Sequence, residues 1–221
     1  MTKEMTVEDE MMLRETSINQ EDVKKYVNEN NFEIEGFISN IIRKNNYVMV
    51  ILAMPKYSTD RKTNFTNFPI IVFTGEDIDL LNGYSKQDYV VIKGNIYSGK
   101  YRHNSKPVLR LSGKSIEKSY PTESSFKYTK LNKVNLTGKV TFVNCPRNNL
   151  LLLGIKVIKN KQVTLCTVEY PSDNAKEIAD QLTKESNVKV EAEFRTRVSK
   201  DENNKMKTFI NVHAKNIEIL D

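Results

Sequence analysis

The chain of 221 residues carries 34 lysine and arginine residues against 28 acidic ones, which gives a formal net charge of +6. This length allows one large domain or two small ones, and no apolar run approaches the roughly 20 residues that span a bilayer. The first 29 residues are acidic and lack the apolar stretch of a signal peptide, so we expect a cytoplasmic protein with no membrane partner.

The cysteines and histidines do not form a recognisable metal or catalytic motif. Cys145 and Cys166 lack zinc-ligand spacing, and we expect both to be reduced core residues. His103 and His213 have no neighbouring cysteine or paired carboxylates. We therefore expect no metal, no cofactor and no enzymatic activity.

The first folded unit is predicted over residues 31–118, behind an acidic arm over residues 1–30 that carries one helix from Gln20 to Val27. Apolar and polar residues alternate with a period of two, which is typical of strands with one buried face. The connections at 56–65 and 98–106 mix cations with aromatic residues, and we expect them to be loops. Strands are predicted at 32–38, 47–54, 67–73, 89–97 and 107–118, with a helical turn at 76–81.

The second unit is predicted over residues 133–221, after a linker at 119–132, and it repeats the plan of the first. Its strands are predicted at 134–140, 150–158, 162–170, 187–197 and 208–218, with a helix over 171–182 whose N-cap is Ser172 or Asp173. A repeat of about a hundred residues indicates two copies of one fold. Five strands with a helix between the third and fourth describe the OB-fold, a Greek-key barrel. The predicted fold is all-β with short helices, in two tandem OB-folds.

The fourth strand of the first unit is expected to separate core from ligand. Its even-numbered residues from Val90 to Ile96 are apolar or glycine and suit a core, whereas the odd-numbered ones from Tyr89 to Tyr97 are mixed, as on a wet ligand-facing surface. The segment 94–101 nearly matches a P-loop, but Tyr101 replaces the required hydroxyl residue and a strand follows in place of a helix. We exclude a nucleotide-binding P-loop.

The segments 68–75 and 88–101 resemble the bacterial and phage single-stranded DNA-binding protein (SSB) family. That family has an aliphatic third strand, a helix, a Lys-Gly-containing fourth strand and a basic, aromatic loop in this order. The resemblance implies base stacking by Phe68, Phe73 and Tyr101. Phe68 and Phe73 are five residues apart on one predicted strand, so they face opposite sides unless a bulge intervenes, and Phe68 is favoured as the exposed one.

The second unit keeps the scaffold of this family but lacks its aromatic residues. The positions that match Phe68, Phe73 and Tyr101 are Gln162 or Val163, Thr167 or Val168, and Ser199. The common bacterial form has one OB-fold per chain, so the tandem arrangement indicates a phage, plasmid or other mobile-element variant. We expect the second unit to add charge, a dimer interface or both.

The predicted function is sequence-independent binding of single-stranded DNA, during replication or conjugative or phage DNA handling. RNA is an alternative ligand, because stacking and phosphate contacts do not discriminate a 2′-hydroxyl. A second hypothesis is an accessory module that contacts replication or DNA-transfer proteins, and ordinary solvation is the alternative role of each cation. The candidate nucleic-acid-binding residues are Phe68, Tyr101, Phe73, Tyr57, Phe65, Tyr97, Lys56, Arg61, Lys62, Lys100, Arg102, Arg195, Arg197, Lys200 and Lys205.

Overall fold

The computed structural model describes residues 28–58, 63–101, 104–200 and 206–220, and the described side chains are those of 28–57, 63–98, 108–199 and 208–220. The first half contains β1 (Asn30–Arg43), β2 (Tyr47–Ser58), β3 (Thr63–Asn67), β4 (Ile70–Thr74), the 3₁₀-helix η1 (Gly75–Leu81), β5 (Tyr89–Tyr101) and β6 (Asn104–Lys118). The connection carries η2 (Glu123–Phe126). The second half contains β7 (Asn132–Arg147), β8 (Leu150–Lys159), β9 (Gln162–Pro171), α2 (Ala175–Gln181), β10 (Asn187–Lys200) and β11 (Met206–Ile219).

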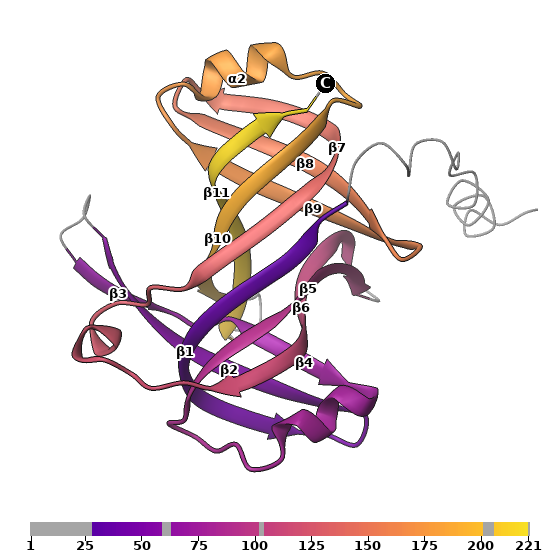
Figure 1. Ribbon diagram of the computed structural model, residues 1–221. Helices are drawn as coiled ribbons and strands as arrows, with labels where there is room; N and C mark the ends of the chain where they lie inside the picture. The colour runs from indigo at the N-terminus through magenta and orange to yellow at the C-terminus, as the bar shows by residue number, and fades with distance from the viewer. Residues whose placement is uncertain (1–27, 59–62, 102–103, 201–205, 221) are drawn as a thin grey trace, which may run out of the picture.

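Each half closes into a five-stranded barrel. In the first, β1 pairs with β2 and β5, and the order β1-β2-β4-β6-β5 returns to β1 through a parallel pairing of β4 with β6. In the second, β7-β8-β9-β11-β10 repeats this order, with β9 and β11 parallel. The helices η1 and α2 lie at opposite ends of the molecule (Figure 1). The prediction of two tandem OB-folds is confirmed.

The two barrels share one continuous sheet, because β1 pairs antiparallel with β7 (Figure 1). Phe32 pairs with Val134, and these residues occupy the same place in the two repeats, so the halves are related by a local two-fold axis at this pair. Both residues are fully buried, and the Phe32 ring meets Phe194 edge-on at 5.5 Å between ring centroids. The hydrophobic core therefore runs through the junction from one barrel to the other.

Two asparagines extend the ladder where β1 and β7 leave their own barrels. The Asn30 side chain donates to the carbonyl of Ile96 at 2.7 Å and accepts from its N–H at 2.9 Å. Asn132 makes the same two bonds with Phe194, each at 2.9 Å. Since a buried backbone group without a partner is costly, each amide substitutes for the missing strand neighbour.

The connection between the barrels is attached to the first barrel. The Glu35 carboxylate accepts from the backbone N–H groups of Lys130 and Leu131, at 2.7 and 3.0 Å. Phe126 stacks on Phe37 at 4.9 Å between centroids. The Phe37 ring in turn lies 4.8 Å from Tyr89, which is buried.

The expectation for β5 is confirmed on one face and corrected on the other. The even-numbered residues from Val90 to Ile96 are buried as predicted. The odd-numbered face is not a free ligand surface, because the Tyr89 end is buried beside Phe37. At the other end, Asn95 accepts a hydrogen bond from Lys159 of the second barrel at 3.3 Å.

Several local predictions are also corrected. The segments expected as loops at 56–65 and 98–106 are largely strand, because β2 with β3 and β5 with β6 form long antiparallel hairpins. The α2 N-cap is Asn174, not Ser172 or Asp173. Cys166 is buried as expected, but Cys145 is only half-buried. The predicted helix at 20–27 lies outside the described residues.

Candidate nucleic-acid interface

The pairing of the strands fixes which residues of the two barrels correspond. Each barrel has one strand that pairs in parallel with the last strand of that barrel: β4, at Ile71, in the first and β9, at Val168, in the second. These two residues occupy the same place, and three residues earlier stand Phe68 and Leu165. The sequence-based match of Phe68 to Gln162 or Val163 is therefore wrong by two or three residues.

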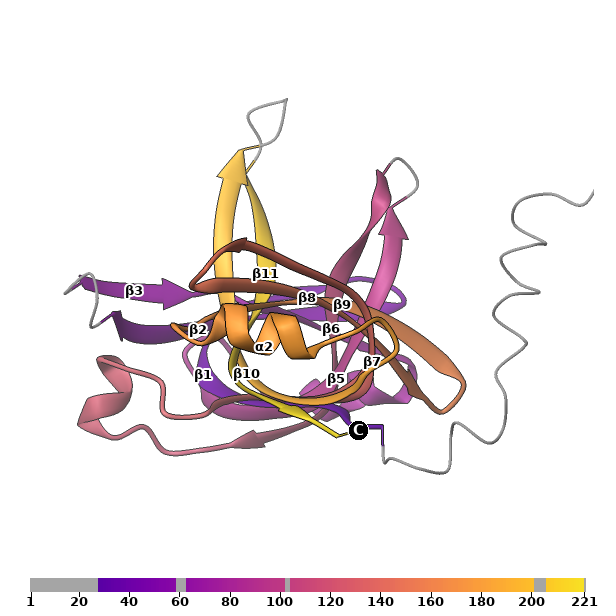
Figure 2. The same ribbon diagram turned by 90° about the horizontal axis from the view of Figure 1, so that it is seen from above.

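Phe68 and Leu165 lie at the foot of the other barrel's hairpin. The Phe68 N–H donates to the Thr196 hydroxyl of β10 at 2.9 Å, and the Leu165 N–H donates to the Ser98 hydroxyl of β5 at 3.1 Å. The two side chains remain 37% and 44% exposed. The β5–β6 and β10–β11 hairpins project on the same side of the molecule (Figure 2). Each barrel thus presents an exposed apolar side chain beside a hairpin of its partner barrel.

Phe73 is a core residue, which corrects its place among the stacking candidates. Its side chain is fully buried, and its ring fills the space above Gly113, where a Cβ would lie 2.3 Å from it. Its counterpart is the buried Tyr170, not Thr167 or Val168. Phe68 precedes β4, whereas Phe73 lies within it, and only the first is free to contact a base.

The remaining aromatic candidates differ in accessibility. Tyr57 on β2 is 49% exposed, whereas Phe65 and Tyr97 are half-buried. Sequence reasoning missed Phe209, which is 40% exposed and lies opposite Arg197 across the β10–β11 hairpin. The signal for it was the alternation of polar and apolar residues in β11, which places Phe209 and the buried Val212 on opposite faces.

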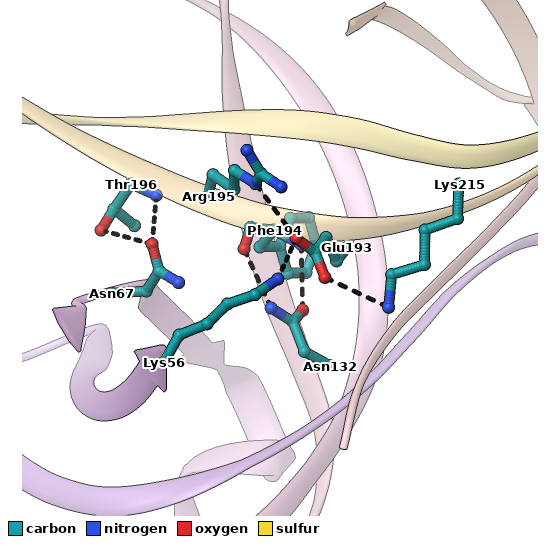
Figure 3. A network of polar contacts seen from close by, with 8 residues as sticks. All are labelled: Lys56, Asn67, Asn132, Glu193, Phe194, Arg195, Thr196 and Lys215. Carbon is teal, nitrogen blue, oxygen red and sulfur yellow. Dashed lines mark hydrogen bonds and ion pairs between the residues drawn. The ribbon is translucent and has the colours of Figure 1, made fainter. Parts of the chain in front are cut away.

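Lys56 and Arg195, both candidate nucleic-acid-binding residues, are held by a buried carboxylate. Glu193 is 3% exposed; its Oε1 accepts from Lys56 and, at 3.0 Å, from Arg195 Nε, while Oε2 lies 3.1 Å from Lys215 Nζ (Figure 3). Burial alone would raise the pKa of Glu193, but the hydrogen bonds and charges of these cations, with Lys56 first, outweigh it and lower the pKa to about 2. Burial lowers the pKa of Lys56 in spite of its carboxylate partner. Three cations surround one ionised carboxylate, which leaves a positive excess.

The other predicted cations are only partly described. Arg197 is exposed on β10, near the foot of the hairpin. Arg61, Lys62, Arg102 and Lys205 lie outside the described residues. The backbones of Lys100, Tyr101 and Lys200 end strands β5 and β10, and their side chains lie outside the described ones.

Among the described residues, no group of three or more His, Cys, Asp or Glu residues is placed to hold a metal ion. None of the described helices is long and apolar enough to cross a membrane. The surface at the hairpin feet presents the exposed side chains of Phe68, Leu165 and Arg197. Rings and cations can contact bases and phosphates.

The class that the fold defines is a tandem OB-fold protein with all strands in one sheet. The wild-type single-stranded DNA binding protein of Thermus aquaticus has a similar structure, with a TM-score of 0.69 and 14% identity over 89% of this chain and 95% of that chain. A deletion mutant of that protein gives a TM-score of 0.66 and 13% identity, over 87% and 94%. No protein-family model matches the sequence, and no curated protein matches it. The likeness establishes the fold.

Proposed function

We propose that the protein binds single-stranded DNA with little sequence preference. The observation that carries this proposal is the placement of exposed Phe68 beside the β10–β11 hairpin, where its N–H bonds to Thr196, next in the chain to the exposed Arg197. Aromatic rings stack on any base, and cations contact any phosphate, so such a surface needs no particular sequence. The fold is shared over almost the whole chain with a protein named for this activity.

The proposed division of labour assigns stacking mainly to the first barrel. Phe68 and Tyr57 belong to this barrel, whereas the corresponding place to Phe68 in the second barrel holds aliphatic Leu165. The second barrel contributes Arg197 and Phe209 on its hairpin. A strand that contacts both would pass from one barrel to the other. The biological setting we propose is DNA replication or the handling of phage or plasmid DNA.

The test is a fluorescence-polarisation titration of labelled dT oligomers against duplex DNA of the same length, at several salt concentrations. We expect tight binding of the single strand, weak binding of the duplex, and an affinity that falls as salt rises because phosphate contacts release counterions. Joint replacement Phe68→Ala with Tyr101→Ala should weaken binding of the single strand by at least about 2 kcal/mol. A labelled RNA oligomer in the same assay measures the preference for DNA.

Equal affinity for single strand and duplex, with no effect of the double replacement, would refute stacking and leave a generic basic surface. The second candidate function would then lead, and a separate observation favours it. The connection between the barrels exposes Tyr120 by 94%, Phe126 by 64% and Tyr128 by 44%. Exposed aromatics of this kind are enriched in protein interfaces. Tyr120→Ser should weaken the binding of a protein partner without changing the affinity for DNA.

A further inference from the structure

A pocket with a volume of about 230 Å³ lies where the first barrel, the connection and the second barrel meet. Lys56 and Asn67 line it from the first barrel, Thr129 from the connection, and Glu193 and Lys215 from the second barrel. A single water molecule needs only about 10–15 Å³ of such space. The pocket therefore has room for a small polyatomic ion.

Two buried polar side-chain atoms in this pocket have no hydrogen-bond partner, namely Asn67 Nδ2 and Thr129 Oγ1. Asn67 is 1% exposed. Its amide orientation is fixed, because Oδ1 accepts from the backbone N–H of Thr196 at 2.8 Å, and an N–H group can only donate. The amide nitrogen points away from Thr196, to the side on which Lys56 lies (Figure 3). Native proteins leave few buried donors unpaired, so this one calls for an acceptor.

The contacts of the neighbouring carboxylate do not include this donor. Oε1 of Glu193 accepts from Lys56 and Arg195, and Oε2 lies beside Lys215, whereas Asn67 Nδ2 has no partner among the described residues. The carboxylate carries one negative charge against three positive ones. The pocket thus offers lysine N–H groups, an amide N–H and a hydroxyl, with an excess of positive charge. A ligand that satisfies such a set is an anion with several acceptor oxygens.

We propose that this pocket binds a phosphate group. Asn67 and Thr129 would supply the uncharged donors, and Lys56 and Lys215 the charge. Tyr57 and Tyr128, both among the lining residues and both exposed, flank it with aromatic surface. The phosphate can come from the solution, as inorganic phosphate, or from the end of a nucleic-acid strand. The site adjoins Phe68, which follows Asn67 in the chain, but phosphate binding by these donors does not require stacking by the Phe68 ring.

The first measurement is the melting temperature of the full chain as inorganic phosphate replaces chloride at constant ionic strength. A ligand that binds only the folded protein raises Tm with the logarithm of its concentration above Kd, by about 3–5 °C when its concentration exceeds Kd tenfold. Direct titration of phosphate, followed by ³¹P NMR, gives the Kd and the stoichiometry. We expect one phosphate per chain.

Two replacements test the assignment to this pocket. Asn67→Asp keeps the acceptor for the Thr196 N–H but places a negative charge where the unpaired donor stood. Because this charge repels phosphate in place of donating a hydrogen bond to it, phosphate binding should weaken at least about tenfold. Thr129→Val removes only the hydroxyl, keeps the shape, and serves where the first variant folds poorly. The matched control is Lys159→Met at the corresponding junction, which should bind phosphate as the parent does.

Oligomers of dT with a 5′-phosphate or a 5′-hydroxyl then separate the two sources. If strand ends occupy the pocket, the phosphorylated oligomer displaces inorganic phosphate and binds more tightly than its hydroxyl counterpart in the parent but not in Asn67→Asp. If both oligomers displace inorganic phosphate alike, an internal phosphate of the strand occupies the pocket; if neither displaces it, while inorganic phosphate still binds, the site serves free phosphate. A Tm that does not respond to phosphate, or responds equally in the parent, Asn67→Asp and Thr129→Val, overturns the proposal.

Discussion

The two junctions between the barrels have the same backbone plan and different chemistry. Lys56 on β2 and Lys159 on β8 occupy corresponding places, and each reaches into the other barrel. Lys56 meets the buried carboxylate of Glu193, whereas Lys159 meets the neutral side chain of Asn95, which holds the place of Glu193, and the carbonyl of Asn30. Only the first junction concentrates charge.

The same junctions differ in what they expose. The charged junction adjoins exposed Phe68, which bonds to Thr196, and the phosphate pocket. The neutral junction adjoins Leu165, which bonds to Ser98. A carboxylate taken out of water is costly unless cations compensate it, so a neutral contact is sufficient where only attachment is needed. The neutral junction thus joins the barrels without a buried carboxylate, whereas the charged one gathers cations around Glu193.

The largest expected effect is the acid sensitivity of the charged junction. The pKa of Glu193 is about 2 in the folded protein against an ordinary value of 4.5, so the unfolded chain binds more protons between these values. The ionised Glu193 carboxylate therefore stabilises the folded protein fully above pH 4.5. This stabilisation, on the order of 3 kcal/mol, is lost as the pH falls toward 2. Glu193→Gln should flatten this part of the stability curve, as measured by urea unfolding at pH 7, 4 and 2.5.

A matched change at the neutral junction sharpens this comparison. Asn95→Glu places a carboxylate beside Lys159 and should introduce an acid-sensitive contribution of the same sign. His213 titrates in a separate window, because burial, with help from the charge of Arg195, lowers its pKa to about 4. The folded protein therefore loses stability through His213 as the pH falls from 6.5 to 4. If the free energies of unfolding of the parent and of Glu193→Gln change in parallel from pH 4.5 to 2.5, Glu193 is not the source of the acid sensitivity.

The next effect concerns the two asparagines beside the shared strands. Asn30→Ala removes the partner of the buried Ile96 N–H, and unfolding by urea should show a loss of about 2 kcal/mol. Asn132→Ala should cost less, about 1 kcal/mol, because Asn132 lines the pocket and water can replace its amide. Equal losses would show that access to the pocket does not matter. The isosteric Asn30→Leu separates the lost bond from the lost volume.

The strands and their inner faces could be predicted from the sequence because alternation is a local signal. The even-numbered residues from Val90 to Ile96 show this, since each was recognised from its neighbours alone. The internal repeat of the sequence also predicted that the second barrel has its strands and helix in the same order as the first. The helical turn after β4 was predicted from Glu76–Leu81, and Leu81 is its buried residue.

The contacts between the barrels could not be predicted, because they join residues distant in sequence. Asn30 and Asn132 read as polar residues at strand edges, and nothing local indicates that they bond to Ile96 and Phe194. No local pattern distinguishes Glu193 from the other acidic residues of the chain. The match of Phe68 failed because the second repeat has a different spacing before its third strand, so only the pairing with β11 shows that Leu165 is the counterpart.

The smallest effect, and the one that tests the comparison most directly, is on DNA affinity at the two hairpin feet. Phe68→Ala should weaken binding of a dT oligomer by about 1.5 kcal/mol, since a partly exposed ring stacks on one base at most. Leu165→Ala should change it by less than about 0.5 kcal/mol, because an aliphatic side chain offers no π-surface. Leu165→Phe extends the test, since it gives the second junction the missing ring and should strengthen binding if the backbone at both feet is equally placed for a strand. Fluorescence titration of the three variants measures this order. If Leu165→Ala weakens binding as much as Phe68→Ala, the two junctions contribute alike, and their chemical difference has a purpose other than strand recognition.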